Sequence, residues 1–213
     1  MTFWRSTFYF GLATLFSLST LYPSYEYSWL LKISPIVLLM LSTWQKKHNK
    51  LTLLFLVGLL CSACGDVLLD FDRGNLFIWG LGAFFVAHLC YLAAIFPLEK
   101  KRAIFIMFYL VYGVGIAWLL LPNLGELLIP VVAYMSVLLL MGMSSVLSRK
   151  TNAWLVLGGL SFVISDSIIG LNKFYSPIPD AHLLIMVTYY FAQFALFKGV
   201  FYQQQFDSRR IFT

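Results

Sequence analysis

Charged residues are scarce in this chain of 213 amino acids, because Asp, Glu, Lys and Arg together make up only 11% of it. Hydrophobic residues make up 61%, and the mean hydropathy is +0.84. A soluble domain of this size has no interior large enough for so much apolar surface. The scarcity of charge excludes an ordinary soluble protein and predicts an all-α protein embedded in a membrane.

Cysteine and histidine are also rare, with three residues of each. Cys61 and Cys64 have the spacing of a redox or zinc pair, but no second pair completes a site, so we expect them to pack against a neighbouring helix. The histidines, His48, His88 and His182, are spread along the chain. A three-histidine zinc site cannot be built from them, and we expect no metal and no redox cofactor.

The apolar residues form about eight segments of roughly 16–23 residues, near the ~20 that a helix needs to cross ~30 Å of hydrocarbon. The links between the segments are short, which implies antiparallel neighbours and no separate extramembrane domain. The sequence predicts a single transmembrane helical domain, residues 1–213, with helices over 4–21, 28–44, 51–70, 75–96, 103–121, 125–147, 152–170 and 182–203.

Basic residues favour one side of this predicted bundle by eleven to three. By the positive-inside rule both termini lie in the cytoplasm, and we expect the inner membrane of a bacterium. The net charge of +6 is scattered over short loops and termini, which excludes a nucleic-acid surface. The eleven are Arg5, Lys46, Lys47, Lys50, Lys100, Lys101, Arg102, Arg149, Lys150, Arg209 and Arg210, and the three are Lys32, Arg73 and Lys173.

Three polar side chains, Asp66, His88 and Asp166, lie inside the apolar segments. A charge at the bilayer centre costs roughly 2.5–3.5 kcal/mol on insertion scales, so such residues indicate a functional site. With a rise of 1.5 Å per residue, each aspartate lies about 6 Å below the outer end of its helix. His88 lies about 20 Å from the outer start of its own helix, which is a poorer match in depth.

Other polar residues accompany these three. Tyr91 follows His88 by three residues and shares its helix face, and Tyr189 with Gln193 forms a pair four residues apart. Gly58 and Asp66 recur as Gly158 and Asp166, one hundred positions later, which suggests a 4+4 internal repeat of the kind found in some transporters.

Several ordered motifs resemble those of the YhhN-like family of integral membrane proteins, whose animal members are lysoplasmalogenases. Lys32 and Pro35 match an early Lys-Pro element, although Ile33 and Ser34 separate them here. The resemblance covers roughly residues 30–200, and its other motifs are 61–69 (CSACGDVLL), 80–91 (GLGAFFVAHLCY), 165–167 (SDS), 173–174 (KF) and 188–193 (TYYFAQ).

This resemblance implies hydrolysis of the vinyl-ether bond of lysoplasmalogens, which releases a fatty aldehyde and a glycerophospho-ethanolamine or -choline. The reaction needs a general acid, a group that orients water, and negative charge beside an oxocarbenium-like cation. We expect Asp66 and Asp166 to form the acid and base pair in either order, with His88 orienting one of them or relaying a proton. The substrate-binding candidates are Lys32, Tyr91, Lys173, Tyr189 and Gln193.

Two other classes of function stay open at this point. Carboxylates on duplicated helices are also what a proton-coupled transporter of lipids or small molecules uses. A lipid-binding membrane protein without turnover is the third possibility. The partners expected are a lysophospholipid and membrane lipids, and the sequence indicates no oligomeric state.

Overall fold

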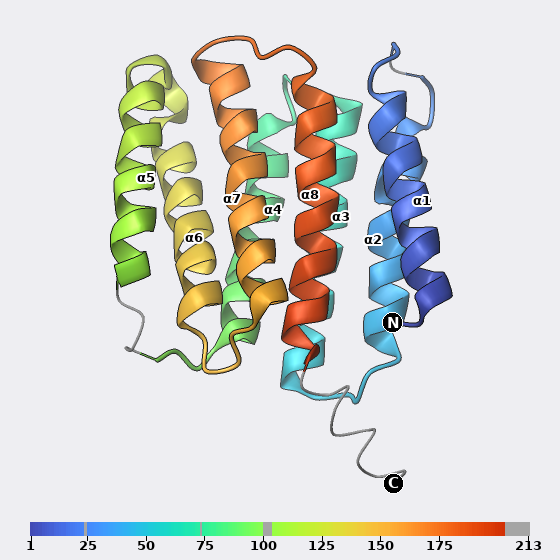
Figure 1. Ribbon diagram of the computed structural model, residues 1–213. Helices are drawn as coiled ribbons and strands as arrows, with labels where there is room; N and C mark the ends of the chain where they lie inside the picture. The colour runs from blue at the N-terminus through green and yellow to red at the C-terminus, as the bar shows by residue number, and fades with distance from the viewer. Residues whose placement is uncertain (24, 73, 100–103, 203–213) are drawn as a thin grey trace, which may run out of the picture.

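The computed structural model describes residues 1–23, 25–72, 74–99 and 104–202, which form a bundle of eight α-helices (Figure 1). Helices were predicted within a few residues of their observed bounds, but the seventh continues a full turn beyond 170. Residues 103 and 203 of the predicted helices, and Arg73, Lys100, Lys101, Arg102, Arg209 and Arg210, lie outside the described residues. The helices are α1 (Phe3–Ser19), α2 (Ser28–Trp44), α3 (Lys50–Phe71), α4 (Phe77–Ile95), α5 (Ile104–Leu120), α6 (Leu128–Leu147), α7 (Ala153–Phe174) and α8 (Ala181–Val200), with short 3-10 turns η2 (Leu121–Asn123) and η3 (Gly125–Leu127) between α5 and α6.

Six spans are long and apolar enough to cross a membrane by length and composition: α3, α4, α5 with η2, η3 with α6, α7 and α8. α2 is a shorter apolar helix of 17 residues. Large apolar side chains such as Ile104, Val114 and Ile129 are exposed on the outside of the bundle, as lipid-facing residues are. The protein is an integral membrane protein with a helical bundle fold.

The helices pack in the same pairs in both halves of the chain. α3 packs most extensively on α4, and α7 on α8, while α2 joins α3 and α6 joins α7. α7 and α8 approach closely because Gly158 and Gly199 have no side chain at their contact. A Cβ on Gly158 would lie only 2.7 Å from the Leu196 nitrogen, and one on Gly199 only 2.5 Å from the Leu155 nitrogen. This pairing agrees with the 4+4 repeat and brings α3, α4, α7 and α8 to the centre of the bundle (Figure 1).

Local sequence accounts for how the central helices start and continue. The side chain of Asn49 caps α3 by accepting from the Thr52 N–H, and Asn152 caps α7 by accepting from the Leu155 N–H. Pro35 lies inside α2 and has no N–H to donate. The Ser34 hydroxyl donates instead to the Leu31 carbonyl at 2.7 Å, so α2 passes through its proline as a helix.

The turn between α3 and α4 is held by Asp72. Its carboxylate accepts from the backbone and side-chain N–H groups of Asn75 and from the backbone N–H of Gly74. These hydrogen bonds, those of Asn75 first, lower the pKa of Asp72 below its ordinary value. The turn is thereby fixed directly beyond the outer end of α3.

Lys32 was assigned to the outer side and lies elsewhere, whereas Lys173 is exposed at the end of α7 as expected. Lys32 is buried on α2 with 4% of its surface exposed, and Lys173 belongs to the last turn of α7 rather than to a loop. Lys32 is inside the bundle because carboxylates on α3 meet its ammonium there, as described below. The inference that both termini are cytoplasmic stays a prediction from the loops.

Candidate active site

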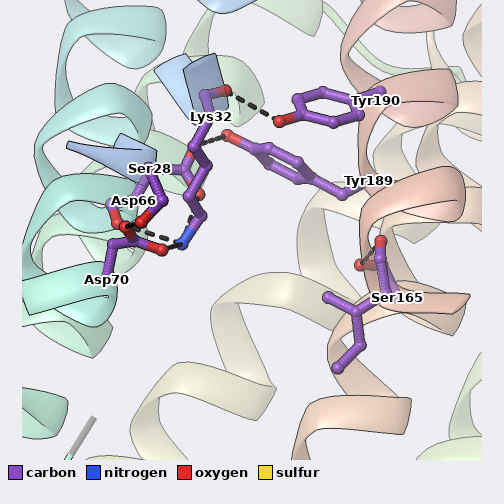
Figure 2. A network of polar contacts seen from close by, with 8 residues as sticks. Ser28, Lys32, Asp66, Asp70, Ser165, Tyr189 and Tyr190 are labelled. Carbon is purple, nitrogen blue, oxygen red and sulfur yellow. Dashed lines mark hydrogen bonds and ion pairs between the residues drawn. The ribbon is translucent and has the colours of Figure 1, made fainter. Parts of the chain in front are cut away.

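Asp66 on α3 forms one side of a buried polar cluster (Figure 2). Its Oδ2 accepts a hydrogen bond of 2.6 Å from the Tyr189 hydroxyl on α8. The Lys32 ammonium on α2 lies 3.6 Å from Oδ1 and donates to the Asp66 backbone carbonyl at 3.0 Å. A cation and a phenol therefore compensate an ionised Asp66 carboxylate for the loss of water.

Lys32 is held from several sides. Its ammonium is also 3.8 Å from Oδ1 of Asp70, one turn beyond Asp66, and Asp70 accepts from the Ser28 hydroxyl. The Tyr190 hydroxyl donates to the Lys32 carbonyl at 2.7 Å (Figure 2). α2, α3 and α8 are thus joined around one buried lysine shared by two carboxylates.

Asp166 on α7 forms the second part of the site. Its Oδ2 accepts a hydrogen bond from the Tyr134 hydroxyl on α6, and it lies 3.7 Å from Nε2 of His88 on α4. His88 Nδ1 is 2.6 Å from the Phe84 carbonyl, and because a carbonyl only accepts, Nδ1 carries the hydrogen. In a neutral imidazole the lone pair of Nε2 is then on the side of Asp166, but at 3.7 Å the two atoms are too far apart for a hydrogen bond, and Nε2 is a buried nitrogen without a hydrogen-bond partner.

Both aspartates line one cavity of about 230 Å³, which we call the polar chamber. It reaches from Lys32 and Asp66 to the C-terminal end of α7 and the N-terminal end of α8, where Lys173 and His182 lie; the loop charges predict that these are the outer ends. The Lys173 ammonium is exposed there and sits 4.3 Å from the centroid of the Phe77 ring. The residues that line the polar chamber with polar groups are Lys32, Asp66, Ser165, Asp166, Asn172, Lys173, His182 and Tyr189.

The polar chamber does not include two of the predicted binding residues. Tyr91 donates to the Gln193 side chain at 2.9 Å and lies 3.1 Å from the Ser62 hydroxyl, in a buried cluster of its own. Neither Tyr91 nor Gln193 lines the chamber. Tyr91 does share the face of His88, since their ring centroids are 6.4 Å apart.

The length of α7 brings His88 and Asp166 together. Because α7 ends at Phe174, Asp166 lies about 12 Å below its outer end, twice the depth expected from the sequence. His88 is eleven residues into α4, or about 16 Å from its outer start. The expected mismatch of about 14 Å falls to about 4 Å, because α7 ends one turn later and α4 begins two residues later than the apolar pattern predicts.

Sequence reasoning missed four polar partners of the site: Tyr134, Ser28, Tyr190 and, as a partner of Lys32, Asp70. A signal existed for Tyr134, which lies in the middle of an apolar segment, away from the interfaces where tyrosine is common.

No group of three His, Cys, Asp or Glu side chains that could hold a metal ion occurs within the described part of the chain.

A comparison with known protein families agrees with the motifs found in the sequence. The sequence profile of the YhhN family matches residues 27–200, which is most of the chain. The chain belongs to the YhhN family. Every residue of the site described above, from Ser28 to Gln193, lies within the matched range of this YhhN protein.

Curated relatives carry a common name. The human protein named lysoplasmalogenase TMEM86B is 30% identical over 194 residues, which cover 89% of this chain and 83% of the relative. A Mycobacterium bovis protein named lysoplasmalogenase is 32% identical over 157 residues, or 70% of this chain. The YhhN chain spans 60% of the length of that mycobacterial relative. No solved structure matches.

Proposed function

We propose that this protein is a membrane-embedded lysoplasmalogenase, which hydrolyses the vinyl-ether bond of alkenyl-glycerophospho-ethanolamine or -choline. The observation that carries the proposal is the convergence of Asp66 and Asp166, from two different helices, on one chamber inside a membrane bundle. The names of the curated relatives support the same activity. A vinyl ether needs two positioned proton-transfer groups for hydrolysis, and the chamber supplies two.

The surroundings of the two carboxylates support different roles. Asp66 faces the Lys32 ammonium and acts as the ionised carboxylate. Asp166 faces a tyrosine hydroxyl and the lone pair of His88 Nε2, and acts as the protonated acid. Two carboxyl groups in unlike environments can in this way hold opposite protonation states.

The reaction adds one water molecule across the vinyl ether. Asp166 transfers its proton to the β-carbon, which forms a C–H bond and leaves an oxocarbenium ion at the α-carbon. Asp66 stabilises this cation, orients a water molecule and takes its proton as the water oxygen bonds to the α-carbon. The hemiacetal then collapses: Asp66 returns a proton to the glycerol oxygen, the C–O bond breaks, and the hydroxyl proton passes to Asp166. His88 lies 3.7 Å from Asp166 and positions it.

The substrate phosphate binds at the outer end of the chamber. Lys173 is exposed there, whereas Lys32 is already between two carboxylates, so Lys173 is the better partner for a phosphate. The loop charges support an inner-membrane location in a bacterium with both termini in the cytoplasm, and in that orientation the chamber opens on the non-cytoplasmic side. Lysophospholipid and bilayer lipids are the partners.

Hydrolysis is favoured over transport by the helices around the site. α3, α4, α7 and α8 run without interruption past the chamber. Secondary transporters commonly bind substrate at discontinuous helices near the midplane. Within the described residues the one proline inside the core helices next to the chamber is Pro35, and α2 continues through it.

Aldehyde release from lysoplasmenyl-choline and -ethanolamine by the purified protein tests the proposal. Asp66→Asn and Asp166→Asn should each lower the rate by about 10²-fold or more, since positioned acid–base groups contribute roughly 10²–10⁴-fold. Asp180→Asn is the matched control, because Asp180 is exposed and makes no side-chain cap hydrogen bond. Activity that survives both site changes in folded protein, or no turnover of either lipid by the unmodified protein, contradicts the proposal.

A further inference from the structure

Three cations from distant parts of the sequence lie at one end of the bundle, away from the polar chamber. Arg5 is in the first turn of α1, Lys46 follows the end of α2, and Lys198 is in the last turn of α8. α1, α2 and α8 pack against one another, and these three ends lie on the same side of the bundle (Figure 1). We call Arg5, Lys46 and Lys198 the basic cluster.

The basic cluster has neutral partners. The Arg5 guanidinium donates to the side-chain oxygen of Gln45, the residue before Lys46. The ammonium groups of Lys46 and Lys198 lie between 5.6 and 5.9 Å from the centroids of phenylalanine rings at the end of α8. All three cations are only partly exposed, and an amide or a ring face compensates a cation less well than a carboxylate does.

Carboxylates are scarce at this end of the helices. Among residues 1–23, 25–72, 74–99 and 104–202, Glu99 is the one acidic residue here, and it pairs with Arg149 in the loop after α6. Burial, and after it the Lys198 ammonium, lower the pKa of Lys46 below its ordinary value. Half-buried cations that repel one another favour the binding of an anion.

The surroundings of the basic cluster indicate the source of this anion. Trp4, next to Arg5, is 78% exposed, and Trp44, at the end of α2, is 63% exposed. Exposed tryptophans at the ends of membrane helices lie at the level of the lipid head groups. The loop charges predict that this end is cytoplasmic, and basic pockets between membrane helices on that side bind the head groups of anionic lipids.

We propose that the basic cluster binds the phosphate group of an anionic phospholipid, such as phosphatidylglycerol, in the cytoplasmic leaflet. The bound phosphate removes the repulsion between the cations and joins α1, α2 and α8. The inference does not depend on the proposed hydrolase function, because the chamber opens at the other end of α8, where His182 lies.

Native mass spectrometry of the full-length protein in a neutral detergent tests the site. Binding of dioleoyl-phosphatidylglycerol is compared with that of dioleoyl-phosphatidylcholine, which has the same acyl chains and no net charge. The test variants are Lys46→Met and Lys198→Met, which lie in different parts of the chain, so one decides the matter if the other does not fold. Lys47→Met is the matched control, because Lys47 is the next residue and is exposed.

The unmodified protein should bind phosphatidylglycerol in preference to phosphatidylcholine. Each test variant should lower the binding of phosphatidylglycerol about fivefold and leave that of phosphatidylcholine unchanged, whereas Lys47→Met should keep the ratio of the two lipids. Added phosphatidylglycerol should also raise the Tm of the unmodified protein, and raise it less in the double variant Lys46→Met/Lys198→Met.

Three results would overturn the inference. The first is equal binding of the two lipids by the unmodified protein. The second is an equal loss in Lys46→Met and Lys47→Met, because the overall charge of the surface would then attract the lipid. The third is displacement of the lipid by millimolar inorganic phosphate but not by sodium chloride of the same ionic strength, which would assign the site to a soluble anion. None of these measurements depends on turnover of lysoplasmalogens, so a failure here leaves the proposed function untouched.

Discussion

Replacing Lys32 with methionine should destabilise the fold strongly, because it removes the cation between two buried carboxylates. Its ammonium lies 3.6 Å from Asp66 and 3.8 Å from Asp70, and the three side chains are between 4% and 8% exposed. At an effective dielectric constant of about 20, each pair attracts by about 4–5 kcal/mol before desolvation is subtracted. Removing one partner of a buried pair typically costs about 3–5 kcal/mol.

The expected change is a loss of about 3 kcal/mol, or roughly 6–12 °C in Tm for a chain of this size. Thermal unfolding of the purified protein in one detergent measures it. Lys173→Met is the matched control, since the exposed Lys173 ammonium loses only its contact with the Phe77 ring, worth about 0.5–1 kcal/mol. The double variant Lys32→Met/Asp70→Asn should recover part of the loss, because one uncompensated carboxylate is removed with the lysine.

Two results would refute this reasoning. If Lys32→Met unfolds at the same temperature as Lys173→Met, the buried ammonium does not stabilise the carboxylates. If Asp70→Asn lowers Tm by the same amount with or without Lys32, the two residues are not coupled. The first outcome would also remove the basis for treating Asp66 as the ionised member of the proposed catalytic pair.

Two further predictions concern the other side of the site and the α3–α4 contact. Tyr134→Phe should lower the rate of aldehyde release about tenfold and Tm by only about 2–4 °C, because it deletes one buried hydrogen bond to the Asp166 carboxyl group. An unchanged rate would contradict that role. Gly58→Ala should lower the stability measured by thermal unfolding by about 1–3 kcal/mol, since its Cβ would lie 2.4 Å from the Tyr91 ring. Gly11→Ala is the control and should not lower it, because a Cβ there has no atom within 4 Å. Equal Tm values for both alanine variants would contradict the packing argument.

The composition and apolar pattern were sufficient to predict the helical membrane bundle and nearly all helix bounds. These predictions succeed because segment length and hydropathy are local properties of the sequence, and each helix must by itself be long and apolar enough to cross the bilayer. The same local reasoning identified Asp66 and Asp166, since a carboxyl group inside an apolar segment is costly wherever the helix packs. His88 was found in the same way, and it was predicted to lie beside one of the two aspartates without a decision as to which.

Only the tertiary structure decided which polar groups meet. The rotation of α2 about its axis turns Lys32 toward Asp66 rather than toward the surface, and one extra turn of α7 lowers Asp166 to the level of His88. Tyr91, which the sequence placed beside the site, instead pairs with Gln193 outside the chamber. Helix rotation and tilt follow from the packing of residues far apart in the chain. The sequence therefore determined which side chains are candidates for the chemistry, and the packing determined how they are paired.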